Sequence, residues 1–97
     1  MRVSFRGSVF SWRGPSPYHF IAVPERVCRD LQAVAKEVTY GWGMIPVVAR
    51  IRGTSFKTSL FPKDGGYLVP VKDVVRTAEG VGVGDRVQVT LEVPTRW

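Results

Sequence analysis

Residues 45–71 read IPVVARIRGTSFKTSLFPKDGGYLVPV, and this stretch decides the fold class. Its apolar residues recur at every second position, which is typical of half-buried β-strands. The Gly53-Thr54 pair and the Pro62–Gly66 cluster interrupt the alternation with residues that favour tight turns. The stretch therefore predicts three consecutive short strands, at residues 45–52, 55–61 and 67–71.

More strands flank this stretch on both sides. Residues 3–12 and 18–23 predict a hairpin with a broad loop, because the Gly14-Pro15-Ser16-Pro17 cluster separates two strand-like runs. Residues 86–93 alternate cleanly between apolar and polar side chains and predict a last strand. We find no internal repeat among these segments.

Two helices complete the expected elements. Val27, Leu31, Val34 and Val38 are spaced by four, three and four, which predicts an amphipathic helix at about residues 25–37, opened by Pro24. Residues 72–79 predict a short second helix that ends before Gly80. Six short strands in one small domain, residues 1–97, avoid exposed edges by closing. We therefore expect a mainly β fold, a closed or nearly closed six-stranded β-barrel with the first helix over one end.

The basic residues are unevenly distributed along the 97-residue chain, whose net charge is +6. Residues 1–16 contain Arg2, Arg6 and Arg13 and no acid, and residues 41–60 likewise contain only basic charges. If these two segments are neighbours, they form one basic face. Such a face serves solubility or attracts an anionic partner.

Five stretches of the chain also resemble a known bacterial family, the domain of unknown function DUF1905. The stretches are VSFRGSVFSWRG (3–14), YHFIAVPERV (18–27), GWGMIPVVARIRG (41–53), TSFKTSLFPKDGGYLVPVKDVVR (54–76) and EGVGVGDRVQVTLEV (79–93). The resemblance implies a small barrel related in architecture to double-split barrels, and it implies no established activity. Some relatives fuse this domain to a second one. We expect any function of this chain to belong to the small domain itself or to a complex that it joins.

The residue types leave little room for catalysis or metal binding. His19 is the only histidine and Cys28 the only cysteine, which is too few for a zinc site within one chain. The Gly80, Gly82 and Gly84 series follows a helix and precedes a strand, the reverse of a nucleotide-binding loop. We expect no catalytic residue, no metal and no cofactor. Lacking a disulfide, a signal peptide and a membrane-spanning run, the chain is expected to be cytoplasmic and not membrane-bound.

Aromatic and basic residues together provide the candidate site. These are Trp12, Tyr40, Trp42, Arg50, Arg52 and Lys57, which we expect near the mouth of the barrel. Aromatic rings beside cations suit anionic or π-bearing ligands. Three functions remain open: a non-catalytic module for a small ligand or protein partner, a nucleic-acid-binding barrel that uses a basic face, and an enzyme with its site at the mouth. The sequence also leaves open whether the chain forms a homodimer.

Overall fold

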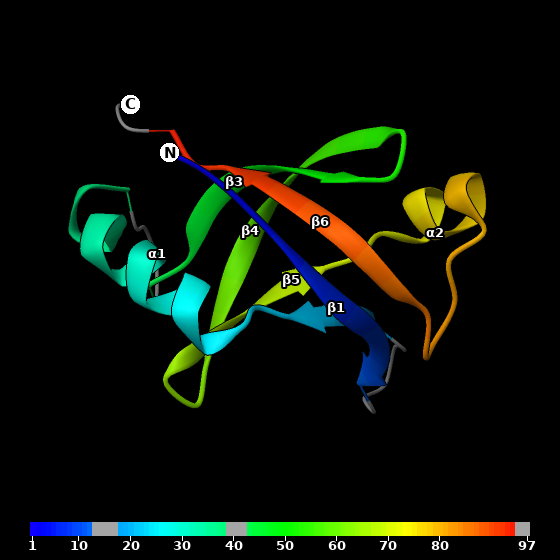
Figure 1. The fold of residues 1–97 in the computed structure, drawn as a ribbon, viewed down its shortest axis with the longest axis horizontal. Coiled ribbons are helices and arrows are strands. Elements are labelled where there is room, and N and C mark those ends of the chain that lie inside the picture. Colours follow the sequence, from blue (N-terminus) through cyan, green and yellow to red (C-terminus); the bar gives the residue numbers. More distant parts are fainter. Residues whose placement is uncertain (13–17, 39–42, 95–97) are drawn as a thin grey trace.

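The computed structural model describes residues 1–12, 18–38 and 43–94, which form six strands and two helices (Figure 1). Each predicted element is present, with ends shifted by at most two residues. In chain order the elements are β1 (Arg2–Trp12), β2 (Tyr18–Ala22), α1 (Glu25–Val38), β3 (Ile45–Ile51), β4 (Thr54–Lys63), β5 (Gly66–Pro70), α2 (Asp73–Glu79) and β6 (Arg86–Glu92).

The strands close into an antiparallel barrel in the order β1-β2-β5-β4-β3-β6, with β6 paired back to β1. This confirms the predicted fold class. Two long strands make closure possible because each pairs with different neighbours along its length. The first part of β1 pairs with β6 and its last four residues pair with β2. In the same way, β4 pairs first with β3 and then with β5.

β4 runs two residues further than the sequence predicts and includes Pro62. Proline lacks an N–H and is tolerated in a strand only where one side needs no ladder bond. That condition holds here, because the pairing of β4 with β3 ends at Leu60 and only β5 pairs beyond it. The Asp64-Gly65 turn that follows has two positive φ angles, 51° and 80°.

The barrel consists of two halves of the same design, each in the order strand, strand, helix, strand. β1 and β4 are equivalent in this scheme, and their sequences match: SFRGSVF at 4–10 and SFKTSLF at 55–61. The expectation of no internal repeat is therefore wrong. The match is confined to the long strands, since the other elements have diverged, most visibly α1 with 14 residues and α2 with 7.

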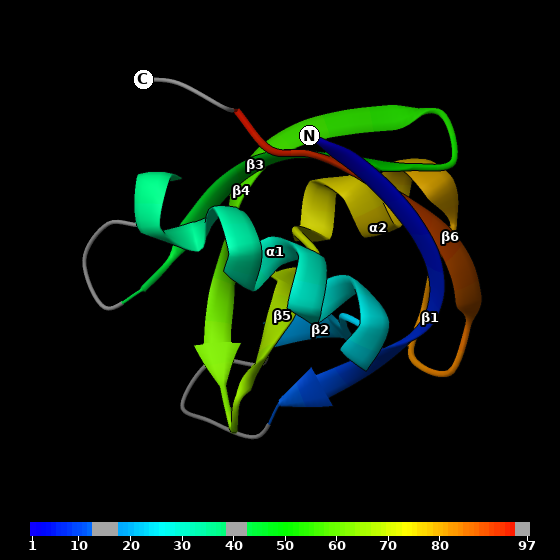
Figure 2. The same cartoon turned by 60° about the vertical axis from the view of Figure 1, so that its left-hand side comes forward.

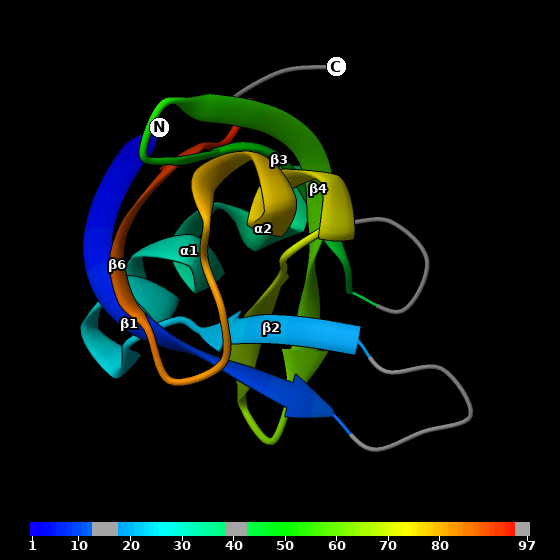
Figure 3. The same cartoon turned by 90° about the vertical axis from the view of Figure 1, so that its right-hand side faces the viewer.

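The two helices cover opposite openings of the barrel (Figures 2 and 3). Val27 and Leu31 of α1 are buried and Val34 is partly buried, which confirms the predicted apolar stripe; the side chain of Val38 lies outside the described residues. α2 ends at Gly80, whose φ of 63° suits glycine. Between the helices the core is formed by inward side chains of all six strands.

Candidate functional site

The described candidate residues do not meet at one barrel mouth. Trp12 lies at the end of β1 in a groove that residues of β2, β4 and β5 complete. Lys57 lies in a different groove, beside Pro46 and Glu92. Arg50 and Arg52 line neither groove. Tyr40 and Trp42 lie outside the described residues, so the structure does not test their placement.

Arg52 and Arg50 take part in structural contacts around the β3–β4 turn. The guanidinium of Arg52 donates a 2.6 Å hydrogen bond to the carbonyl of Glu79 at the end of α2. The Nε of Arg50 donates to the carbonyl of Arg52, which has a positive φ of 53°. Thr54 also bonds the carboxylate of Glu79. These contacts join the turn to α2, so Arg52 holds the helix over the barrel opening.

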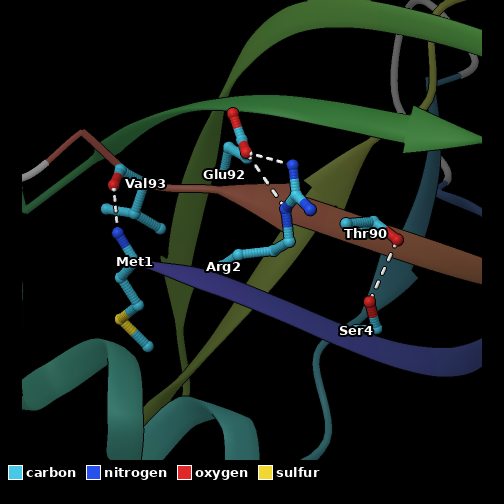
Figure 4. A network of polar contacts seen from close by, with 6 residues as sticks. All are labelled: Met1, Arg2, Ser4, Thr90, Glu92 and Val93. Atoms are coloured by element: carbon cyan, nitrogen blue, oxygen red, sulfur yellow. Dashed lines mark hydrogen bonds and ion pairs between the residues drawn. The ribbon is translucent and has the colours of Figure 1, made fainter.

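The two basic segments do share one surface, because β6 lies between β1 and β3. Arg2 is opposite Glu92 in the ladder and forms an ion pair with it at 2.6 Å. Two residues further along β1, the hydroxyl of Ser4 forms a hydrogen bond with that of Thr90 (Figure 4). Arg50 lies across from Thr90 on the other side of β6. The outer wall of β1, β6 and β3 is therefore polar and mainly basic.

A groove on this basic wall, about 480 Å³ in volume, contains three arginines from three elements. We call it the arginine groove. Arg6 comes from β1, Arg86 from β6 and Arg26 from the first turn of α1. Its other lining residues are Ser4, Phe5, Pro24 and Gln88.

The opposite wall, over β2 and the later parts of β1 and β4, is apolar. A groove of about 430 Å³ lies on it, which we call the aromatic groove. Three of its rings are exposed: Trp12 by 38%, Tyr18 by 60% and Phe61 by 45%. Large apolar side chains gathered in one exposed patch are typical of interaction sites. The remaining lining residues are Phe20, Pro62, Lys63 and Leu68.

Cross-strand pairing fixes the rings of the aromatic groove. Trp12 faces Tyr18 and Phe10 faces Phe20 in the β1–β2 ladder, so four rings share the outer face. Phe20 is at their centre, with its ring centroid 6.3 Å from that of Trp12 and 6.4 Å from that of Tyr18. The Trp12 and Phe20 rings meet edge to face at 79°, a favourable arrangement.

Lys63 is the only basic residue among those lining the aromatic groove. Its Nζ lies 3.7 Å from the centroid of the Trp12 ring, within the range of a cation–π interaction. No ion pair involving Lys63 is found among the described residues. The groove thus combines an apolar wall with one positive charge at its rim.

The remaining reactive groups are dispersed. The Cys28 thiol is buried and donates to the carbonyl of Val23. The Nδ1 of His19 is buried and has no hydrogen-bond partner among the described residues. Burial raises the pKa of the Tyr67 phenol above its usual 10.0, with a smaller contribution from Cys28. Within the described parts of the chain, no three metal-ligating residues gather.

Most residues of both grooves were not predicted as site residues, although the sequence contains one pattern that indicates the aromatic groove. Once Val9 and Ile21 are assigned inward, alternation puts Phe10, Trp12 and Phe20 outward, where polar residues are usual. Outward aromatic rings on consecutive strands indicate a binding surface. Phe61 and Lys63 join it only through the pairing of β4 with β5.

Comparison with known proteins adds a family but no activity. No curated protein matches the chain. None of the described helices is long and apolar enough to cross a membrane. A family model matches residues 5–91, nearly the whole chain. The protein therefore belongs to the DUF1905 family, which is described as a domain of unknown function.

Proposed function

We propose that this barrel is a non-catalytic binding module whose site is the aromatic groove. Its ligand is a small molecule with a flat apolar body and an acidic group. The observation that carries the proposal is the exposed cluster of Trp12, Tyr18 and Phe61 around a groove whose one cation is Lys63. The volume of about 430 Å³ is within the usual range for small-ligand sites.

The chemistry of the lining supports binding rather than catalysis. Among the residues that form the groove, only Tyr18 and Lys63 carry ionisable side chains, and within the described parts of the chain neither is ion-paired with an acid or base that would make a catalytic pair. The rings offer flat faces and edges for stacking, and Phe20 holds Trp12 and Tyr18 in place through its contacts. An acidic group on the ligand would pair with Lys63.

Fluorescence of Trp12 tests the proposal directly. The chain has three tryptophans, so the double substitution Trp42→Phe and Trp97→Phe leaves Trp12 as the only indole. We expect 2-naphthoate, a flat acid, to change this emission saturably, and the neutral 2-naphthylmethanol to bind more weakly. In the same background, Lys63→Met should weaken naphthoate binding by about three- to tenfold, because an exposed charge pair contributes about 1 kcal/mol.

Two further variants separate the groove from general surface hydrophobicity. Phe61→Ala removes an exposed ring from the groove and should weaken binding of both naphthyl compounds. Val74→Ala is the matched control, since Val74 on α2 is 71% exposed and lies outside the groove. Equal affinity in the parent, Lys63→Met and Phe61→Ala would refute the proposal. So would a stable dimer in sedimentation velocity that Phe61→Ala dissociates, because a second copy would then occupy the groove.

A further inference from the structure

We propose that the arginine groove is a second binding site, specific for phosphate groups. It shares no lining residue with the aromatic groove, so it does not depend on the function proposed above.

Strand pairing and helix position bring the three arginines together. Arg6 is opposite Gln88 and Arg86 is opposite Ser8 in the β1–β6 ladder. Arg6 and Arg86 are therefore diagonal neighbours on the same outer face, within reach of a common ligand. Arg26, from the first turn of α1, also lines this groove.

No acid neutralises these charges within the described structure. The residues lining the groove include no aspartate or glutamate. Asp85, next to Arg86 in sequence, accepts the N–H of Gly82 instead. Glu25 and Asp30, the acids nearest Arg26 along α1, form no ion pair in this part of the chain. Arg2 on the same wall provides the contrast, since Glu92 pairs with it.

Phosphate is the ligand that best fits a groove lined by three arginines. A guanidinium presents a planar fork of N–H donors that matches two oxygens of a phosphate, whereas a lone carboxylate offers oxygens to fewer arginines. Ser4 and Gln88 add neutral donors at the edge of the groove. The phosphate could belong to a small phosphorylated molecule or to a nucleic-acid backbone, and both sources present the same chemistry.

The test measures the binding of two phosphate-containing probes to the parent protein and to two arginine variants. Pyrophosphate binding is measured by calorimetry, and binding of fluorescently labelled single-stranded DNA by anisotropy at low and near-physiological salt. We expect Arg86→Gln to weaken binding of whichever probe binds by about tenfold, as for the loss of a charge-assisted hydrogen bond. Arg2→Gln removes the same charge from the same wall, where Glu92 already engages it, and should have little effect.

The probes also identify the source of the phosphate. Binding of pyrophosphate with micromolar affinity indicates a small phosphorylated ligand. Preference for DNA, with an affinity that falls steeply with salt and a salt slope that decreases by about one in Arg86→Gln, indicates a nucleic-acid backbone. The proposal is overturned if neither probe binds at low salt, or if Arg2→Gln and Arg86→Gln weaken binding equally. Either result would leave the arginines as part of a diffuse solubility charge.

Discussion

Of the described glycines, Gly7 has the closest neighbours for an added Cβ atom. A Cβ atom at this position would lie 2.5 Å from the Cγ2 of Ile21 and 3.4 Å from the carbonyl oxygen of Ala22. Ile21 is fully buried and has little room to move. The residue therefore lets β1 turn from its pairing with β6 to its pairing with β2, although its φ is not one that requires glycine.

Substitution of Gly7 should destabilise the protein through this contact alone. We expect Gly7→Ala to lower the free energy of unfolding by about 1–3 kcal/mol, as for other overpacked cores. Urea denaturation measures the change. Gly82→Ala is the control, because its new Cβ would meet only the Asp85 carboxylate at 4.0 Å and should alter stability by less than about 0.5 kcal/mol. Similar losses in both variants would contradict the close approach.

Because of Tyr67, the free energy of unfolding should depend on pH in the alkaline range. Burial raises the pKa of its phenol above 10.0, so the folded chain keeps this proton at pH values where the unfolded chain releases it. Ionisation therefore favours the unfolded state, and the free energy of unfolding should fall as the pH rises above 10.0. Tyr67→Phe cannot ionise and should show a shallower fall. Denaturation at about pH 9 and about pH 11 compares the two proteins; parallel losses would contradict the role of Tyr67.

At the scale of elements, the long strands explain why the barrel folds as one unit. β1 takes β6 as a partner, and β4 takes β3, so each long strand pairs with the last strand of the other half. Within its own half, β3 has no partner, since it pairs only with β4 and β6. Each half alone retains a single hairpin, and an isolated hairpin is marginally stable in water.

We therefore expect the separate halves, residues 1–52 and 53–97, to lack sheet structure. Far-ultraviolet circular dichroism of each fragment should indicate a largely unfolded chain, and mixing the two should restore the sheet signal in a concentration-dependent manner. A fragment that folds cooperatively by itself would show that the exchange of strands between halves is not needed for stability.

Local sequence patterns predicted the elements but not the neighbours that form the grooves. Alternation at Val87, Val89 and Leu91 and the helical spacing of Val27 and Leu31 required only residues close in sequence, and these assignments are confirmed. Phe20 and Phe61 are about forty residues apart, and only the register of β2, β5 and β4 brings them to one groove. The repeat was missed because divergence of the helices left it visible only in β1 and β4.

At the scale of the whole molecule, the barrel has two different outer walls. One is apolar and lies around Phe20, and the other is basic and lies around Arg6 and Arg86. Arg6, Arg26 and Arg86 line the groove on the basic wall, whereas Lys63 is the only basic residue that lines the aromatic groove. Both candidate sites are lined mainly by side chains of the outer face of the barrel. We propose that the small ligand binds in the aromatic groove rather than at a mouth of the barrel.

The most direct measurement is a titration of nitrogen-15-labelled protein with 2-naphthoate, followed through the backbone amide signals. We expect saturable shifts confined to the ends of β1 and β4 and to their partners in β2 and β5, around Trp12, Phe20, Phe61 and Leu68. Shifts centred on Arg6 and Arg86 would instead mean that the acid is bound by the basic wall. That result, or the absence of saturable shifts in the groove, would refute binding of the ligand in the aromatic groove.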